Sequence, residues 1–135
     1  MQRGALAAVV GGRLLLGYFV QCVAPRDARK FTSISVYKDG QLAWGAVASD
    51  PTSAAYTWME IGVAPDGFVE TVYDAALLGE ITSPSYRGQL GVGVTAMSGE
   101  SYGGSLNLVD RSLLAEDVVL WGGQLTTRSA VSCPD

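Results

Sequence analysis

A serine lies at the centre of residues 99–104, which read GESYGG and contain the spacing G-x-S-x-G. In this spacing, a sharp turn between a strand and a helix can expose the Oγ atom of Ser101 for attack on an ester or amide carbonyl. The attack requires a nearby base, normally a histidine, that removes the hydroxyl proton. The chain contains no histidine. We therefore expect residues 99–104 to form a glycine-rich turn between strands, and we expect the protein not to be an enzyme.

The same six residues resemble the nucleophile turn of the serine carboxypeptidases and other α/β-hydrolases. The resemblance implies that Ser101 is the nucleophile, followed by a helix over residues 105–115 and a parallel strand over residues 118–121. It covers a short part of the chain, so a serine hydrolase is the third hypothesis for function. Antiparallel pairing of residues 90–97 with residues 105–109 would exclude the turn that this hypothesis needs.

Two cysteines, Cys22 and Cys133, lie far apart and match no metal-binding or redox spacing such as CxxC. In an oxidising compartment they could form a disulfide, which would close a long loop and stabilise the fold by roughly 4 kcal/mol. In a reducing compartment they would remain two thiols. The sequence leaves both alternatives open. We expect no metal site and no cofactor.

Aromatic side chains are the best candidates for binding, because their flat rings can stack on a sugar or anchor a protein partner. Tyr56, Trp58 and Tyr102 are the residues selected on this ground. Tyr56 and Trp58 are two positions apart, so we expect them on one face of a strand. An exposed face would be a binding surface for a glycan or a protein. An inward face would make the rings part of the core, which is the favoured alternative.

The charges argue against a nucleic-acid partner, because the net charge is −4 and the pI is about 4.6. Nucleic-acid binding normally needs a basic face that neutralises phosphates. The one basic cluster, Arg26, Arg29 and Lys30, is interrupted by Asp27, and we expect it to be a solvated loop. The acidic residues of the middle of the chain show no calcium-loop spacing; they are Asp50, Glu60, Asp66, Glu70, Asp74 and Glu80.

The N-terminal segment, residues 5–24, is largely apolar but is interrupted by Arg13 and by Gly11 and Gly12. We therefore expect no membrane span there and interpret the segment as part of the fold. The glycine pair favours a tight hairpin turn between residues 6–10 and 13–23.

Strand signals continue along the chain and indicate further hairpins. Lys38-Asp39-Gly40 predicts the turn of a second hairpin, and Pro65-Asp66-Gly67 the turn of a third. Helical turns are expected only at residues 74–80 and 110–116, and residues from 124 onward could add an edge strand. The strands expected in these hairpins and after them are residues 31–37, 41–49, 56–63, 68–73, 90–97, 105–109 and 118–120.

These patterns predict a single β-domain over residues 1–135. We expect an all-β fold, either an antiparallel two-sheet sandwich or a closed barrel of about seven to nine strands, built largely from hairpins.

Composition provides the leading functional hypothesis. Only 16% of the residues are charged, against about 25% in an ordinary soluble domain, which suggests that part of the surface is buried against other subunits. We therefore predict a non-enzymatic structural protein, such as a decoration-type subunit of a viral or phage particle, that forms a homo-oligomer or larger assembly. The alternative is a carbohydrate-binding or adhesion module of β-sandwich type. A virion or extracellular location is favoured over a cytoplasmic one.

Overall fold

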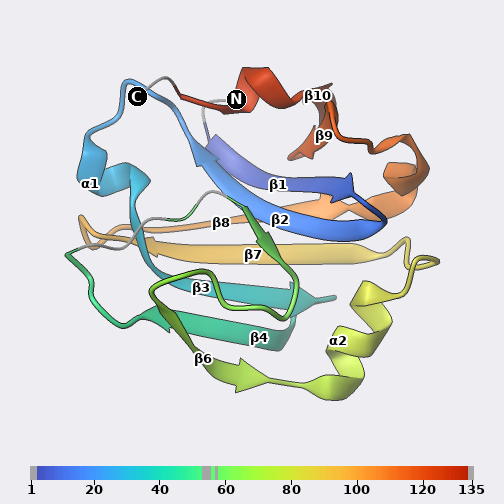
Figure 1. The fold of residues 1–135 in the computed structure, drawn as a ribbon, viewed down its shortest axis with the longest axis horizontal. Helices are drawn as coiled ribbons and strands as arrows, with labels where there is room; N and C mark the ends of the chain where they lie inside the picture. The colour runs from blue at the N-terminus through green and yellow to red at the C-terminus, as the bar shows by residue number, and fades with distance from the viewer. Residues whose placement is uncertain (1–2, 53–55, 57, 134–135) are drawn as a thin grey trace.

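Two antiparallel five-stranded sheets pack face to face in the computed structural model, which describes residues 3–52, 56 and 58–133 (Figure 1). The all-β fold is confirmed, and of the two architectures expected from the sequence it is the sandwich, because the sheets are not closed into a barrel. The described residues form ten strands, more than the expected seven to nine.

Sheet A has the strand order β10-β9-β1-β2-β5, and sheet B has the order β6-β4-β3-β7-β8. The strands of sheet A are β1 (Arg3–Val10), β2 (Arg13–Val20), β5 (Trp58–Glu60), β9 (Val118–Trp121) and β10 (Gln124–Thr127). Those of sheet B are β3 (Phe31–Lys38), β4 (Gln41–Ala48), β6 (Phe68–Tyr73), β7 (Gln89–Ala96) and β8 (Ser101–Asn107). Among the described residues, three short helices lie between strands: α1 (Arg26–Arg29), α2 (Ala75–Thr82) and η1 (Leu108–Leu113). A further short helix, η2 (Arg128–Val131), follows β10.

The first two hairpins form where the turn chemistry predicts them. Gly11 and Gly12 both have positive φ angles, and β1 pairs with β2 along its whole length. In the β3–β4 hairpin the turn residues Asp39 and Gly40 also have positive φ, a conformation that Asp and Gly adopt more readily than other residues.

The third expected hairpin is wrong, because its two strands belong to different sheets. β5 pairs with β2 in sheet A, whereas β6 pairs with β4 in sheet B. Directly after β5, the N–H of Val63 donates to the carbonyl of Glu60 at 3.1 Å, and Gly62 has a φ of 85°. This turn redirects the chain toward the other sheet. The turn at residues 65–67 then leads into β6 instead of closing a hairpin.

Helix α2 is longer than the single turn expected at residues 74–80. The side chain of Asp74 accepts a hydrogen bond from the N–H of Leu77 at 3.0 Å and caps the N-terminus. Leu78 and Ile81 are buried on its inner side and fix the helix to the end of the sandwich. The second expected helix forms as the 3₁₀ helix η1, which begins at Leu108, earlier than predicted.

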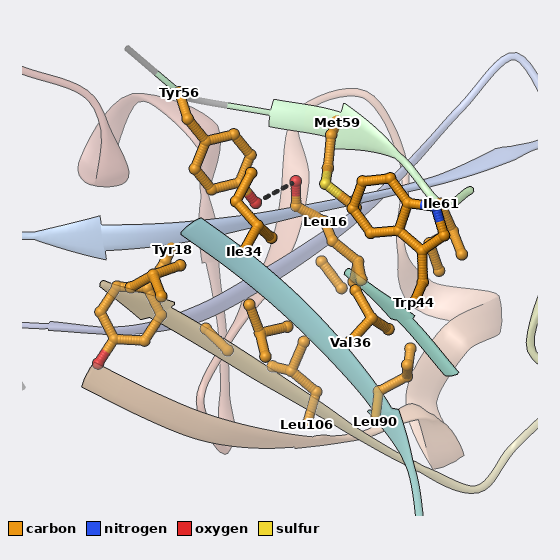
Figure 2. Close-up of a cluster of buried hydrophobic side chains, with 14 of the residues drawn as sticks. Leu16, Tyr18, Ile34, Val36, Trp44, Tyr56, Met59, Ile61, Leu90 and Leu106 are labelled. Carbon is orange, nitrogen blue, oxygen red and sulfur yellow. Dashed lines mark hydrogen bonds between the residues drawn. The ribbon is translucent and has the colours of Figure 1, made fainter. Parts of the chain in front are cut away.

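The core lies between the sheets and consists mainly of residues at alternate strand positions, with Leu78 and Ile81 of α2 added at one end. Figure 2 shows the ring of Trp44 beside Met59 and Ile61, with Leu16 on the facing sheet. The side chain of Trp44 is completely buried, and its Nε1 atom donates to Oε2 of Glu70 at 2.7 Å. Trp44 is the largest fully buried side chain in this core.

Sheet A is apolar on its outer face as well, which explains why the N-terminal strands lack polar alternation. Leu6, Ala8 and Val119 point away from the main core and are buried beneath Val131. Val131 belongs to residues 128–133, which we call the C-terminal strap. The strap therefore covers part of a sheet face that would otherwise be exposed to water.

The two sheets approach closely where β8 passes β1. A Cβ atom at Gly104 would lie 3.2 Å from the backbone nitrogen of Ala5 and 3.3 Å from its Cβ atom. The neighbouring Gly103 points away from the core and has solvent-side space. We expect Gly104→Val to lower the free energy of unfolding by about 1–3 kcal/mol, because the added side chain overpacks the contact between the sheets.

Gly103→Val is the matched control, since valine suits a strand and meets no backbone atom closer than 3.7 Å at its Cβ position. Urea unfolding of both variants measures the difference. Equal stability of the two variants would contradict the close packing of β1 on β8.

Candidate functional site

Ser101 is the first residue of β8 and lies directly opposite Thr95 of β7. The two strands are antiparallel and joined by a tight turn in which Gly99 has a φ of 92°. The N–H of Ala96 donates to the carbonyl of Glu100 at 2.8 Å. The glycine-rich turn between strands forms, but it is shorter than the expected residues 99–104, because β8 already begins at Ser101. The strand–turn–helix arrangement of a hydrolase nucleophile is absent at this serine.

Tyr102 is buried between two other side chains. Its ring stacks on that of Tyr18, with 5.9 Å between the ring centroids and 8° between the ring planes. The guanidinium carbon of Arg3 lies 4.7 Å from the centroid of Tyr102, a distance at which a cation is attracted to an aromatic face. The stacking and cation–π contacts leave Tyr102 without the broad exposed face that made it a binding candidate.

Tyr56 is also buried, and its hydroxyl donates to the carbonyl of Leu16 at 3.1 Å (Figure 2). Burial raises the pKa of Tyr56 well above its ordinary value, so the hydroxyl stays protonated and keeps this bond. Tyr56 is therefore a core residue, which is the second of the two alternatives considered for it, and not part of an exposed binding surface.

Trp58 belongs to a different cluster from Tyr56, although the sequence predicts that they share a face. Trp58 packs beside the buried residues on the outer side of sheet A, whereas Tyr56 precedes β5 and lies in the main core. The indole of Trp58 is half-buried, and the guanidinium carbon of Arg128 lies 5.0 Å from its ring centroid. The residue that would place the pair on one regular strand, Thr57, lies outside the described residues.

Cys22 and Cys133 form a disulfide with 5.4 Å between their Cα atoms. The bond joins the end of the β1–β2 hairpin to the C-terminal strap. It therefore holds the strap at one end, while Val131 packs on the outer face of sheet A.

The acidic residues of the middle of the chain do not gather at one point. Glu60 pairs with Arg13 at 3.3 Å, Glu80 pairs with Lys38 at 3.0 Å, and Glu70 accepts from Trp44. The described part of the chain holds no group of three or more residues of metal-ligating type.

An exposed apolar strip on β4 and β6 is the main surface feature that the sequence does not identify. Val47 and Val69 are directly opposite one another on the outer side of sheet B, and 43% and 54% of their surfaces are exposed. Leu42 on β4 is similarly exposed. We call these three residues the β4–β6 strip. The sequence of β6 contained a signal for this strip, because apolar residues occupy successive positions at both ends of the strand. A strand with one solvated face normally alternates between apolar and polar residues.

Strand β6 lies at the edge of sheet B, but its pairing is irregular. The register with β4 shifts between Gly45 and Ala46, so that Thr71 is an extra residue on β6. Such a bulge bends an edge strand and hinders the addition of another strand to it. The β4–β6 strip is therefore better suited to packing by its side-chain face than by its backbone edge.

The chain matches no protein-family model, and neither the curated proteins nor the solved structures give a match. Within residues 3–52, 56 and 58–133, none of the helices has the length and apolar character needed to span a membrane.

Proposed function

We propose that this protein is a non-enzymatic structural subunit that associates with further copies of itself through the β4–β6 strip. The observation that carries the proposal is the exposure of neighbouring Val47 and Val69 on the outer face of sheet B. Contiguous apolar surface on a soluble domain commonly marks a protein–protein contact. A shell of repeated subunits, such as a viral or phage particle, is the proposed setting.

The disulfide and the low proportion of charged residues agree with this setting. A disulfide persists in extracellular proteins and on particle surfaces, so we propose a virion or extracellular location. A subunit whose surface is largely covered in an assembly also needs fewer charged residues for solubility. The glycan-binding alternative has less support, because two of its three candidate rings, Tyr56 and Tyr102, are buried and Arg128 lies over the half-buried ring of the third, Trp58.

The oligomeric state tests the proposal directly. We expect the wild-type protein to self-associate as its concentration is raised, as measured by light scattering and sedimentation equilibrium. Val69→Lys should weaken this association by about tenfold or more, because it places a charge in the apolar contact. Since Val69 is exposed, the change should leave the free energy of unfolding within about 0.5 kcal/mol of the wild-type value.

Val109→Lys is the matched control. Val109 is 60% exposed on η1 and lies outside the strip, so its replacement should leave association unchanged. A wild-type protein that remains monomeric at high concentration would refute the proposed function. An equal effect of both lysine variants would refute the assignment of the strip.

A further inference from the structure

A cavity of about 400 Å³ lies among the end of β2, helix α1, the start of β5 and the C-terminal strap. Four aromatic side chains line it: Tyr18, Phe19, Tyr56 and Trp58. Its volume falls in the range of about 300–1,000 Å³ that is usual for small-molecule sites. Aromatic walls of this kind favour a ligand with an apolar or aromatic ring.

Arg29 provides the one side chain that is charged at neutral pH among the described residues lining this cavity. It is half-buried at the end of α1, and its Nε atom donates to the carbonyl of Ala24 at 3.0 Å. This bond holds the guanidinium group in place. Within the described residues, neither an ion pair nor a further hydrogen bond occupies the terminal nitrogens of Arg29.

A half-buried guanidinium group is stabilised by an anion that accepts hydrogen bonds from two of its nitrogens. One positive charge matches a carboxylate better than a phosphate ester, which carries a charge of about −1.5 to −2 at neutral pH. The cavity therefore combines aromatic residues with a single cationic site for a carboxylate.

We propose that this cavity binds a small monocarboxylate that carries an apolar or aromatic ring. The carboxylate accepts hydrogen bonds from Nη1 and Nη2 of Arg29, and the ring lies against Trp58 and Phe19. This site is separate from the β4–β6 strip, which belongs to the other sheet, so it does not depend on the proposed assembly function.

Phenylacetate and its neutral amide, phenylacetamide, are suitable probes because they differ in charge and have nearly the same shape. Calorimetric titration of the full chain should show that phenylacetate binds at millimolar concentration, as expected for a ligand of this size. Phenylacetamide should bind at least about tenfold more weakly, since it loses the charged hydrogen bonds. This comparison uses the wild-type protein and therefore does not depend on the folding of a variant.

Arg29→Gln should weaken phenylacetate binding by about tenfold or more, because it removes the positive charge. Arg26→Gln is the matched control, since Arg26 belongs to the same helix but is exposed and does not line the cavity. Its affinity should equal that of the wild type. Absence of phenylacetate binding, equal binding of the amide, or unchanged affinity in a folded Arg29→Gln variant would each overturn the proposal.

Discussion

Replacing both Cys22 and Cys133 by serine is expected to lower the free energy of unfolding by about 4–5 kcal/mol. The two residues are 111 positions apart, so the disulfide closes almost the whole chain into one loop. In the chain-entropy account, removing the cross-link that closes so long a loop gives the unfolded chain many more conformations. Urea unfolding of the double variant, compared with the oxidised wild type, measures the loss.

The C-terminal strap should also loosen in the double variant. Val131 would then cover Leu6, Ala8 and Val119 less completely, and a dye that binds apolar surface should fluoresce more strongly. Wild-type protein treated with a thiol reductant is the control and should reproduce both effects. A decrease of less than about 1 kcal/mol in both samples would contradict the stabilising role assigned to the disulfide.

The second large effect is expected for Trp44→Ala, which should lower the free energy of unfolding by about 3–5 kcal/mol. Trp44 is completely buried between the sheets, and its removal would leave a cavity beside Met59 and Ile61. Surrounding side chains fill such a cavity only in part, so lost contacts add to the lost hydrophobic burial. The shift of the urea midpoint at constant slope measures the change.

Two further variants separate packing from hydrogen bonding at this position. Trp44→Phe retains much of the apolar volume but cannot donate to Glu70, so its loss should be smaller than that of Trp44→Ala. Glu70→Gln keeps an oxygen that can accept from Nε1 and should change stability by less than about 1 kcal/mol. If Glu70→Gln costs as much as Trp44→Ala, the hydrogen bond, and not the packing of the indole, would dominate.

Local sequence patterns predicted most of the strands and two of the three hairpins. Gly11 with Gly12, and Asp39 with Gly40, specify turns because few residues adopt positive φ without strain. Alternation along β7, with Leu90 and Val92 inward and glycines outward, also fixes which face is buried. These features depend on neighbouring residues and can therefore be recognised without knowledge of the fold.

The partners of β5 and β6 were not predictable in the same way. A turn at residues 65–67 looks the same whether it closes a hairpin or follows a crossing between sheets. The choice is made by packing: Met59 of β5 faces the core opposite Leu16, while Val69 of β6 lies beside Val47. Such pairings join residues that are far apart in the chain, so they cannot be predicted from local periodicity.

In the candidate sites, too, some features follow from the local sequence and others only from long-range packing. The absence of histidine already weighed against catalysis by Ser101, and its antiparallel surroundings then removed the turn that such a nucleophile needs. Residue type alone identified the aromatic side chains and a short basic cluster. The cluster was expected to be a solvated loop, but residues 26–29 form helix α1 and Arg29 is half-buried. Only the tertiary structure buries Tyr56, stacks Tyr102 on Tyr18, and places Arg29 and Trp58 in the lining of one cavity. Exposure and proximity are decided by which distant strands and helices pack together to exclude water from the core.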